Sequence, residues 1–207
     1  MNPNNKIIKL TLIGETDVGK TQISNRLADK PFSENYIATI GASMVKIEYN
    51  DKETGESTWF YLWDTAGQEK YRTLAPVYFH DSDVVLIVYD VSNEESFQKL
   101  SVWYDLFNEN ASKFDDHCIL IIGNKIDLRE NEIDSNDDEQ TNKKLYVETS
   151  RGREWAQEHN CDFIEVSAKT GENIGSIVEK MVEYSKMLHI HREESILNAK
   201  KAESGCC

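Results

Sequence analysis

The sequence lacks the features that place a protein across a membrane or outside the cell. Its 207 residues contain no run of about 18 apolar residues, so no membrane-spanning helix is expected. The first residues, MNPNNKIIKL, have no apolar signal core, so secretion is not expected either. Cysteine is scarce, and Cys118 and Cys161 lie beside apolar runs, which is typical of buried thiols in a reducing compartment.

An excess of positive charge is also lacking. Lysine and arginine number 23 against 37 aspartate and glutamate residues, which gives a formal net charge of −14. Sequence-independent binding of nucleic acid needs a basic surface that releases counterions, so nucleic acid is not expected as a partner. The length fits one well-buried domain and is too short for two.

Strand-like and helix-like segments alternate along the chain. Four short runs are rich in β-branched residues and have apolar residues at both odd and even positions. This is the pattern of strands buried on both faces. These runs are residues 7–13, 83–90, 118–124 and 162–168. Segments 44–50 and 58–63, joined by DKETGES, predict an antiparallel hairpin. The predicted fold class is α/β, with a doubly wound, mostly parallel six-stranded sheet and one antiparallel edge strand.

Two helices are indicated by their apolar period. Ser92 and Glu95 form a capping-box pattern before a helix whose apolar face includes Phe97 and Phe107. A second helix has the same period near the end of the chain, through residues Ile174, Ile177, Met181, Tyr184 and Leu188.

Two segments do not fit a core. Residues 130–142 hold six acidic residues and no basic one, which predicts a solvated loop insertion, with a specific partner site as the alternative. From about residue 189 the apolar period is lost. The sequence therefore predicts a domain at 1–188 and a flexible tail at 189–207.

A glycine-rich motif follows the first strand-like run. GETDVGKT, residues 14–21, matches G-x-x-x-x-G-K-[ST] between a strand and a plausible helix, with a chance glycine turn as the alternative. Backbone N–H groups of such a loop and of the following helix N-terminus surround a β-phosphate. Lys20 is then placed to bridge the β- and γ-phosphates, and the Thr21 hydroxyl to bind Mg²⁺.

A second motif, LWDTAGQE at residues 62–69, ends another strand. Asp64 is placed like a carboxylate that holds Mg²⁺ through water. Gly67 leaves room for its N–H to approach the γ-phosphate, and Gln68 can orient the attacking water. Taken alone, the motif is also compatible with an ordinary strand-to-loop turn.

Two further strand ends carry groups that fit a base. In GNKID, residues 123–127, Asp127 can accept hydrogen bonds from N1–H and the 2-amino group of guanine, a pair that adenine does not offer. Asn124 adds a polar contact and the Lys125 stem can cover the base. In SAK, residues 167–169, the Ala168 N–H can meet the guanine O6, although this tripeptide alone fits any polar strand exit.

This ordered set of motifs resembles the Ras superfamily of small GTPases, and within it the Rab family. The resemblance covers about residues 6–188 and the final cysteines, and it implies a P-loop small G domain. YIATIGASM and WDTAGQEKYRTLAPVYF are similar to the two Rab switch segments, and LAPVYF is similar to the early-endosomal branch.

The resemblance implies a set of site residues. The residues that bind GTP or GDP are Glu15, Thr16, Asp17, Val18, Gly19, Lys20, Thr21, Phe32, Tyr36, Thr39, Gly67, Asn124, Lys125, Asp127, Ser167, Ala168 and Lys169. The Mg²⁺ ligands are Thr21, Thr39 and Asp64, and the catalytic residues are Gln68, Lys20 and Gly67. The effector surface is Ile40, Met44, Trp63 and Tyr78. Without the resemblance, Phe32, Trp63 and Tyr78 are simply core aromatics.

The implied function is a GTP/GDP switch in vesicle trafficking that recruits effectors in the GTP state. No catalytic arginine is evident near the first switch, so hydrolysis is expected to be slow without an activating protein. The other implied partners are an exchange factor, an escort protein and a GDP-dissociation inhibitor. A monomer on the cytoplasmic face of endomembranes is expected, at the early endosome and with a cytosolic pool. The rivals are an ATPase, which Asp127 argues against, and a binding module that barely hydrolyses, which Gln68 argues against.

Three positions depart from the family pattern. Asp17 stands where many relatives have a small residue, so its carboxylate either repels the phosphates or points into solvent and is screened. Thr16 adds bulk that Rab proteins tolerate. Met44 replaces the usual phenylalanine of the effector surface, which keeps the apolar character and alters the shape.

Cys206 and Cys207 are adjacent, so a disulfide between them would be strained. An accidental free end, a metal-binding tail and a lipid attachment site are the three readings of the residues alone. The resemblance implies that both cysteines are geranylgeranylated and that the protein is held at a membrane by two prenyl groups.

The variant Cys206→Ser is expected to lose most of its membrane association, because a single lipid chain holds a protein only reversibly. The tail cannot compensate, since residues 189–207 contain three basic and three acidic residues and gain little from anionic lipid. Cell fractionation measures the effect, and equal membrane retention of variant and parent would contradict it.

Overall fold

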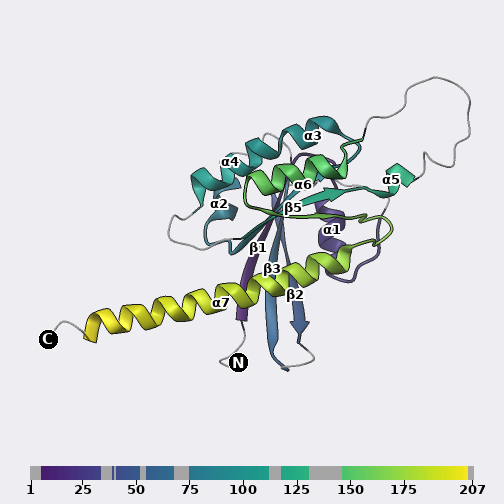
Figure 1. Cartoon of the computed structure of the whole chain (residues 1–207). Coiled ribbons are helices and arrows are strands. Elements are labelled where there is room, and N and C mark those ends of the chain that lie inside the picture. The colour runs from purple at the N-terminus through teal and green to yellow at the C-terminus, as the bar shows by residue number, and fades with distance from the viewer. Residues whose placement is uncertain are drawn as a thin grey trace, which may run out of the picture.

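The computed structural model describes residues 6–33, 39, 41–51, 55–67, 75–111, 118–130 and 146–204 (Figure 1). Within these ranges the strands are β1 (Lys6–Ile13), β2 (Ala42–Asn50), β3 (Ser57–Thr65), β4 (Val84–Asp90), β5 (Cys118–Asn124) and β6 (Asp162–Glu165). The helices are α1 (Lys20–Leu27), α2 (Ala75–Phe79), α3 (Glu94–Gln98), α4 (Leu100–Asn110), α5 (Asp127–Glu130), α6 (Thr149–Glu158) and α7 (Ile174–Ser204). No helix in this part of the chain is both long and apolar enough to cross a membrane.

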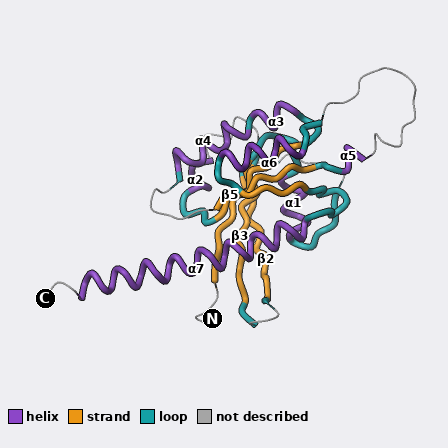
Figure 2. The backbone as a smooth tube through the Cα atoms, in the orientation of Figure 1, coloured by secondary structure: helices purple, strands orange, loops and turns teal. Residues whose placement is uncertain are grey.

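The strands form one six-stranded sheet in the order β2-β3-β1-β4-β5-β6 (Figure 2). Only β2 runs antiparallel to its neighbour, with Ala42 opposite Thr65 and Asn50 opposite Ser57. The other pairings are parallel, so helices must connect those strands. The predicted fold class is confirmed, including the antiparallel edge strand.

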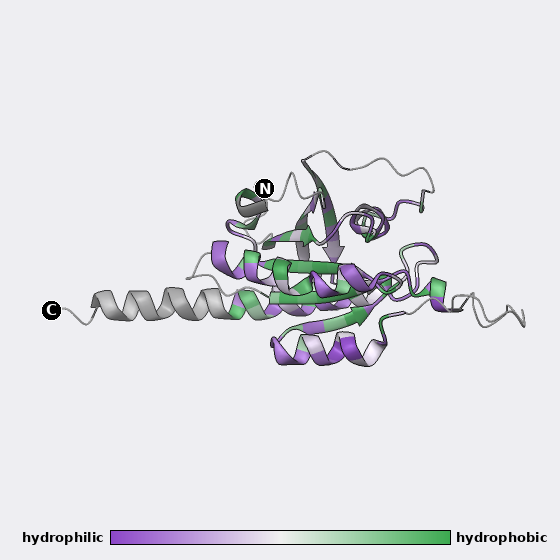
Figure 3. Cartoon of the chain, turned by 90° about the horizontal axis from the view of Figure 1, so that it is seen from above, coloured by the Kyte–Doolittle hydropathy of each residue, from purple (hydrophilic) through white to green (hydrophobic). Residues whose placement is uncertain are grey.

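Both faces of the sheet are covered by helices, because the side chains of its central strands are apolar on both faces. In β4 every residue is buried. Val84, Leu86 and Val88 belong to the core under α1 and α7, whereas Val85 and Ile87 belong to the core under the other layer of helices. Seen from above, the hydrophobic strands run between helices with hydrophilic outer surfaces (Figure 3).

The helix predicted from the capping box differs from the observed one. Asn93, not Ser92, is the N-cap, and its side chain accepts a hydrogen bond from the Ser96 N–H at 3.2 Å. Ser92 instead donates its hydroxyl to Asp90 at 2.8 Å. Neighbouring short polar residues compete for one capping position, and the spacing alone does not decide between them.

The predicted apolar period ends near residue 188, but helix α7 continues as far as Ser204. Local composition explains the difference. Between Gly175 and Gly205 the chain contains neither glycine nor proline. Alanine, glutamate, lysine and leucine have high helix propensity, so they favour a helix even where it has no apolar face. The division into a domain and a tail stays a prediction, and Cys206 and Cys207 lie outside the described residues. Cys118 is buried as expected, but Cys161 is only half-buried.

A glycine allows α6 to approach the sheet closely. A Cβ atom on Gly152 would lie 2.5 Å from Tyr89 Oη and 2.7 Å from the Phe163 ring. Helix propensity alone favours alanine over glycine by about 1 kcal/mol at such a position. Forcing a methyl group into a filled contact costs about 1–3 kcal/mol, so packing outweighs propensity.

The variant Gly152→Ala is therefore expected to lower the free energy of unfolding by up to about 2 kcal/mol, the packing cost less the propensity gain. Gly175→Ala is the matched control, because its Cβ meets nothing within 4 Å in α7 and only the propensity gain is left. Urea denaturation measures both variants. A stabilised Gly152→Ala protein would show that the contact relaxes freely.

Candidate functional site

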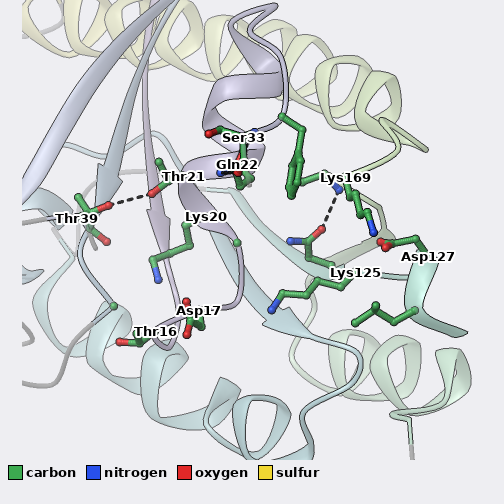
Figure 4. Close-up of a pocket in the computed structure, with 17 residues that line it drawn as sticks. Thr16, Asp17, Lys20, Thr21, Gln22, Ser33, Thr39, Lys125, Asp127 and Lys169 are labelled. Atoms are coloured by element: carbon green, nitrogen blue, oxygen red, sulfur yellow. Dashed lines mark hydrogen bonds between the residues drawn. The ribbon is translucent and has the colours of Figure 1, made fainter. Parts of the chain in front are cut away.

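A cavity of about 360 Å³ opens at the carboxyl ends of the parallel strands (Figure 4). This edge is where open α/β sheets bind ligands, because the loops after the strands meet there. The lining residues are Thr16, Asp17, Gly19, Lys20, Thr21, Gln22, Phe32, Ser33, Thr39, Thr65, Gly67, Asn124, Lys125, Asp127, Leu128, Ala168 and Lys169.

The loop between β1 and α1 brings the start of α1 into the cavity. Gly19 has a φ of 94° and caps the helix, a left-handed conformation that glycine adopts without strain. A Cβ atom there would lie 2.3 Å from Asn124 Nδ2, so only glycine fits. The unpaired N–H groups and positive end of α1 therefore meet the cavity, which favours an anion.

Lys20 is buried within this loop. Its Nζ donates to Gly14 O at 2.9 Å and to Glu15 O at 2.6 Å. Burial lowers the pKa of Lys20 to about 8, partly opposed by the charges of Asp64 and Glu15. An ammonium has three donors, so one more can be donated to a ligand. Gly67 approaches closely, since a Cβ there would lie 2.4 Å from this Nζ.

The predicted metal ligands lie together at one end of the cavity. Thr21 Oγ1 and Thr39 Oγ1 are 2.9 Å apart. Asp64 is buried, and its Oδ1 has no hydrogen-bond partner among the described residues. Burial raises the pKa of Asp64, against a hydrogen bond from Thr21 and the charge of Lys20. Two hydroxyls and an unsatisfied carboxylate oxygen fit Mg²⁺, which takes few protein ligands and is completed by phosphate and water.

The opposite end of the cavity is built around two buried side chains. Asn124 donates from Nδ2 to Val18 O at 2.8 Å and accepts at Oδ1 from the Ala168 N–H at 3.1 Å. Ser167 donates its hydroxyl to Asp127 Oδ1 at 2.6 Å. The amide thus joins the glycine-rich loop to the loop after β6, and the Ala168 N–H predicted to meet a base already has a protein acceptor.

Lys125 lines the same end. Its Nζ lies 2.8 Å from Asp90 Oδ2 and holds the stem beside the cavity. The short helix α5 that follows is fixed by Arg129, whose guanidinium donates to both carboxylate oxygens of Glu165 at 2.8 Å. This pair of hydrogen bonds fixes the segment that carries Asp127 and Leu128.

Three of the predicted binding residues stand behind the lining. Glu15 accepts a hydrogen bond at Oε1 from the indole N–H of Trp103 at 3.0 Å, which ties the loop to α4. The Val18 side chain is buried in the core, so only its backbone faces the loop. Ser167 acts on the cavity through Asp127. Tyr36, Ile40 and Gln68 lie outside the described residues.

Four lining residues were not predicted. They are Gln22, Ser33, Thr65 and Leu128. The side chain of Thr65 donates to Leu12 O at 2.6 Å, so it fixes β3 to β1 rather than adding a reactive group. Gln22 and Leu128 directly follow motif residues, and this adjacency is the only feature of the sequence that points to them. Phe32 lies on the cavity and belongs to neither core cluster.

The predicted effector positions form an apolar surface on β2, β3 and α2. Met44 is 49% exposed and stands opposite Trp63 in the sheet register. The half-buried rings of Trp63 and Tyr78 have centroids 5.8 Å apart. Neither ring belongs to the buried core. Val77, 70% exposed, adds an apolar side chain on α2 that the sequence did not single out.

Comparisons with known proteins agree with these features. A model of the Ras family matches residues 9–187. GTP-binding protein YPT52 of Saccharomyces cerevisiae is 36% identical over 95% of this chain and 88% of its own length. Ras-related protein Rab-5B of Plasmodium falciparum is 33% identical over 87% and 78%, and Ras-related protein Rab-18 of Lymnaea stagnalis is 35% identical over 85% and 79%.

Asp17 combines both alternatives considered for it, because it is exposed and also lines the cavity, at a φ of 64°. Asparagine tolerates this left-handed conformation and has the same shape, so Asp17→Asn removes only the charge. The variant is expected to release guanine nucleotide about threefold more slowly at low salt, because a repulsion beside the phosphates is lost.

Asp29→Asn is the matched control, since Asp29 is also exposed with a φ of 56° and does not line the cavity. Dissociation of labelled GDP measures both variants. The effect at Asp17 is expected to shrink in 1 M salt, where screening acts over about 3 Å. Equal rates for the parent and both variants would place the carboxylate in solvent.

Proposed function

The chain belongs to the Ras family of small GTPases, within its Rab branch, and we propose that the cavity at the carboxyl edge of the sheet is its GTP site. As a member of this family it binds guanine nucleotide, hydrolyses GTP and acts as a switch in vesicle trafficking. The observation that supports this site best is the meeting of an anion-binding helix end and a buried Asp127 in one cavity.

In the proposed mode of binding, the start of α1 and Lys20 hold the phosphates. Lys20 already has two backbone acceptors, Gly14 O and Glu15 O, so its ammonium is fixed before a ligand arrives. At the other end Asp127, held by Ser167, selects guanine because its carboxylate is a pure acceptor. Adenine presents no matching donor pair, so it cannot make these two hydrogen bonds to the Asp127 carboxylate.

Thr21, Thr39 and Asp64 would hold Mg²⁺, which supplies a positive charge that neutralises the phosphates. Thr39 has a hydroxyl partner, Thr21, at 2.9 Å, so the first switch segment is attached to α1 at this point. Gly67 lets the second switch segment approach Lys20. The proposed switch is the release of these two segments when the γ-phosphate is lost.

Hydrolysis is proposed to depend on Gln68, which orients the attacking water, and on a partner. None of the residues that line the cavity in the described part of the chain is an arginine. Within the described residues, Lys20 and backbone N–H groups are then left to stabilise a transition-state charge on the phosphate, and Mg²⁺ would add to them when bound. An activating protein that brings an arginine would supply the missing charge.

The family associates with endomembranes and acts through regulators and effectors. For this chain we propose an early-endosomal location, attachment through prenylated Cys206 and Cys207, and effector binding at Met44, Trp63 and Tyr78. The Rab-5B name of one relative supports the location, the exposure of Met44 supports the effector surface, and the adjacent cysteines at positions 206 and 207 support the attachment. An exchange factor, an escort protein and a GDP-dissociation inhibitor are the further proposed partners.

The protein purified without added nucleotide is expected to carry GDP in a ratio close to one per chain. The nucleotide is expected to stay bound during purification, because the cavity offers a fixed lysine and a buried acceptor. Slow hydrolysis then converts bound GTP to GDP. Denaturation followed by chromatography identifies the nucleotide. Adenine nucleotide would overturn the proposed site, and retained GTP would show a binding module that barely hydrolyses.

Asp127→Asn is the control for base recognition. Asparagine keeps the acceptor for Ser167 but adds an amide donor, so guanine is expected to be lost and xanthine, with an oxygen in place of the 2-amino group, to be bound. Unchanged binding of GDP by this variant would place the base elsewhere.

A further inference from the structure

Helix α1 contributes more to the cavity than its phosphate-facing start. Gln22 and Arg26 lie four residues apart, on one face of the helix. Each makes two hydrogen bonds to a loop at the cavity: Gln22 to the segment that directly follows α1, and Arg26 to a loop about 140 residues farther along the chain. No motif in the sequence includes either residue.

Arg26 holds the loop after β6. Its Nε donates to Ala168 O at 2.8 Å and its Nη2 donates to Lys169 O at 2.7 Å. Both acceptors belong to residues that line the cavity. The peptide unit is planar and trans, so fixing the Ala168 carbonyl also fixes the direction of the Lys169 N–H. The guanidinium thereby sets the orientation of a donor at the base end.

Gln22 holds the segment that carries Phe32. Its Nε2 donates to Ser33 O at 2.9 Å, and its Oε1 accepts from the Ser33 N–H at 3.2 Å. The amide thus pairs with the backbone as a neighbouring strand would. Phe32, the next residue toward the N-terminus, lines the cavity beside this point.

We propose that Arg26 and Gln22 are positioning residues that hold the two sides of the guanine site and set the lifetime of bound nucleotide. The proposal rests on the proposed function of the cavity. One helix then contacts the phosphates with its backbone and fixes the base loops with its side chains. Nucleotide release requires a loop to move, and each loop is restrained by a pair of hydrogen bonds.

Arg26 contributes to base recognition as well as to lifetime. The loop that it holds carries the N–H groups of Ala168 and Lys169. The Ala168 N–H already donates to Asn124 Oδ1, so in the proposed mode of binding the Lys169 N–H is the donor left for the guanine O6. Asp127 accepts from N1–H and the 2-amino group, farther along the same edge of the base. Loss of Arg26 should therefore weaken the recognition of O6 and leave the recognition of the 2-amino group intact. A merely structural role predicts no such difference.

The test compares dissociation rates of GDP, 6-thio-GDP and inosine diphosphate from the full chain. For Arg26→Ala, GDP release is expected to be about tenfold faster than for the parent. This is the size of effect expected from the net loss of one or two hydrogen bonds. The preference for GDP over 6-thio-GDP is expected to fall, and the preference for GDP over inosine diphosphate to stay. Gln22→Ala is expected to accelerate all three nucleotides about equally.

Arg151→Ala is the matched control, because Arg151 also makes two hydrogen bonds, to Glu94 at 2.7 and 2.8 Å, away from the cavity. Arg26→Lys should recover part of the GDP lifetime, since lysine retains a donor but not the planar fork. A GDP release rate in Arg26→Ala equal to that of Arg151→Ala overturns the proposal. So does an equal acceleration of GDP and 6-thio-GDP. If the parent binds no GDP, the proposed function itself fails.

Discussion

The site depends on one buried amide. Asn124 joins the glycine-rich loop, through Val18 O, to the loop after β6, through the Ala168 N–H. It also packs so closely against Gly19 that no side chain fits there. A buried amide that loses a partner is costly, so the two loops are held at one separation. That separation is the distance between the phosphate-binding and base-binding ends of the cavity.

The electrostatics of the site are local. The chain carries a formal net charge of −14, which repels nucleotide at long range. Attraction within the cavity comes from the start of α1 and from Lys20, whose pKa burial lowers to about 8. Asp64 is buried close to that lysine, and one of its oxygens has no hydrogen-bond partner in the part of the chain that the structure describes. A divalent cation between this carboxylate and a phosphate would compensate two negative groups at once.

The sequence predicts the sheet well because its signals are local. Alternate apolar residues of β4 belong to the cores on the two faces of the sheet. The spacing from Gly14 to Thr21 fits one loop geometry. The contacts of Arg26 could not be predicted, since Ala168 lies 142 residues away and carbonyl acceptors leave no pattern. The choice of Asn93 as the N-cap of α3 could not be predicted either, because neighbouring short polar side chains compete for that position. The extent of α7 was missed because helix propensity, rather than an apolar face, continues it past Leu188.

Helix α7 has a mechanical consequence. It contains 31 residues and begins shortly after the Ala168–Lys169 loop. At about 1.5 Å per residue it is about 46 Å long, and roughly its first half packs on the sheet. The remainder extends away from the body, as Figure 1 shows. The part beyond Leu188 is therefore a spacer, which places Ser204 about 24 Å from the packed part of the helix, at about 1.5 Å for each of 16 residues.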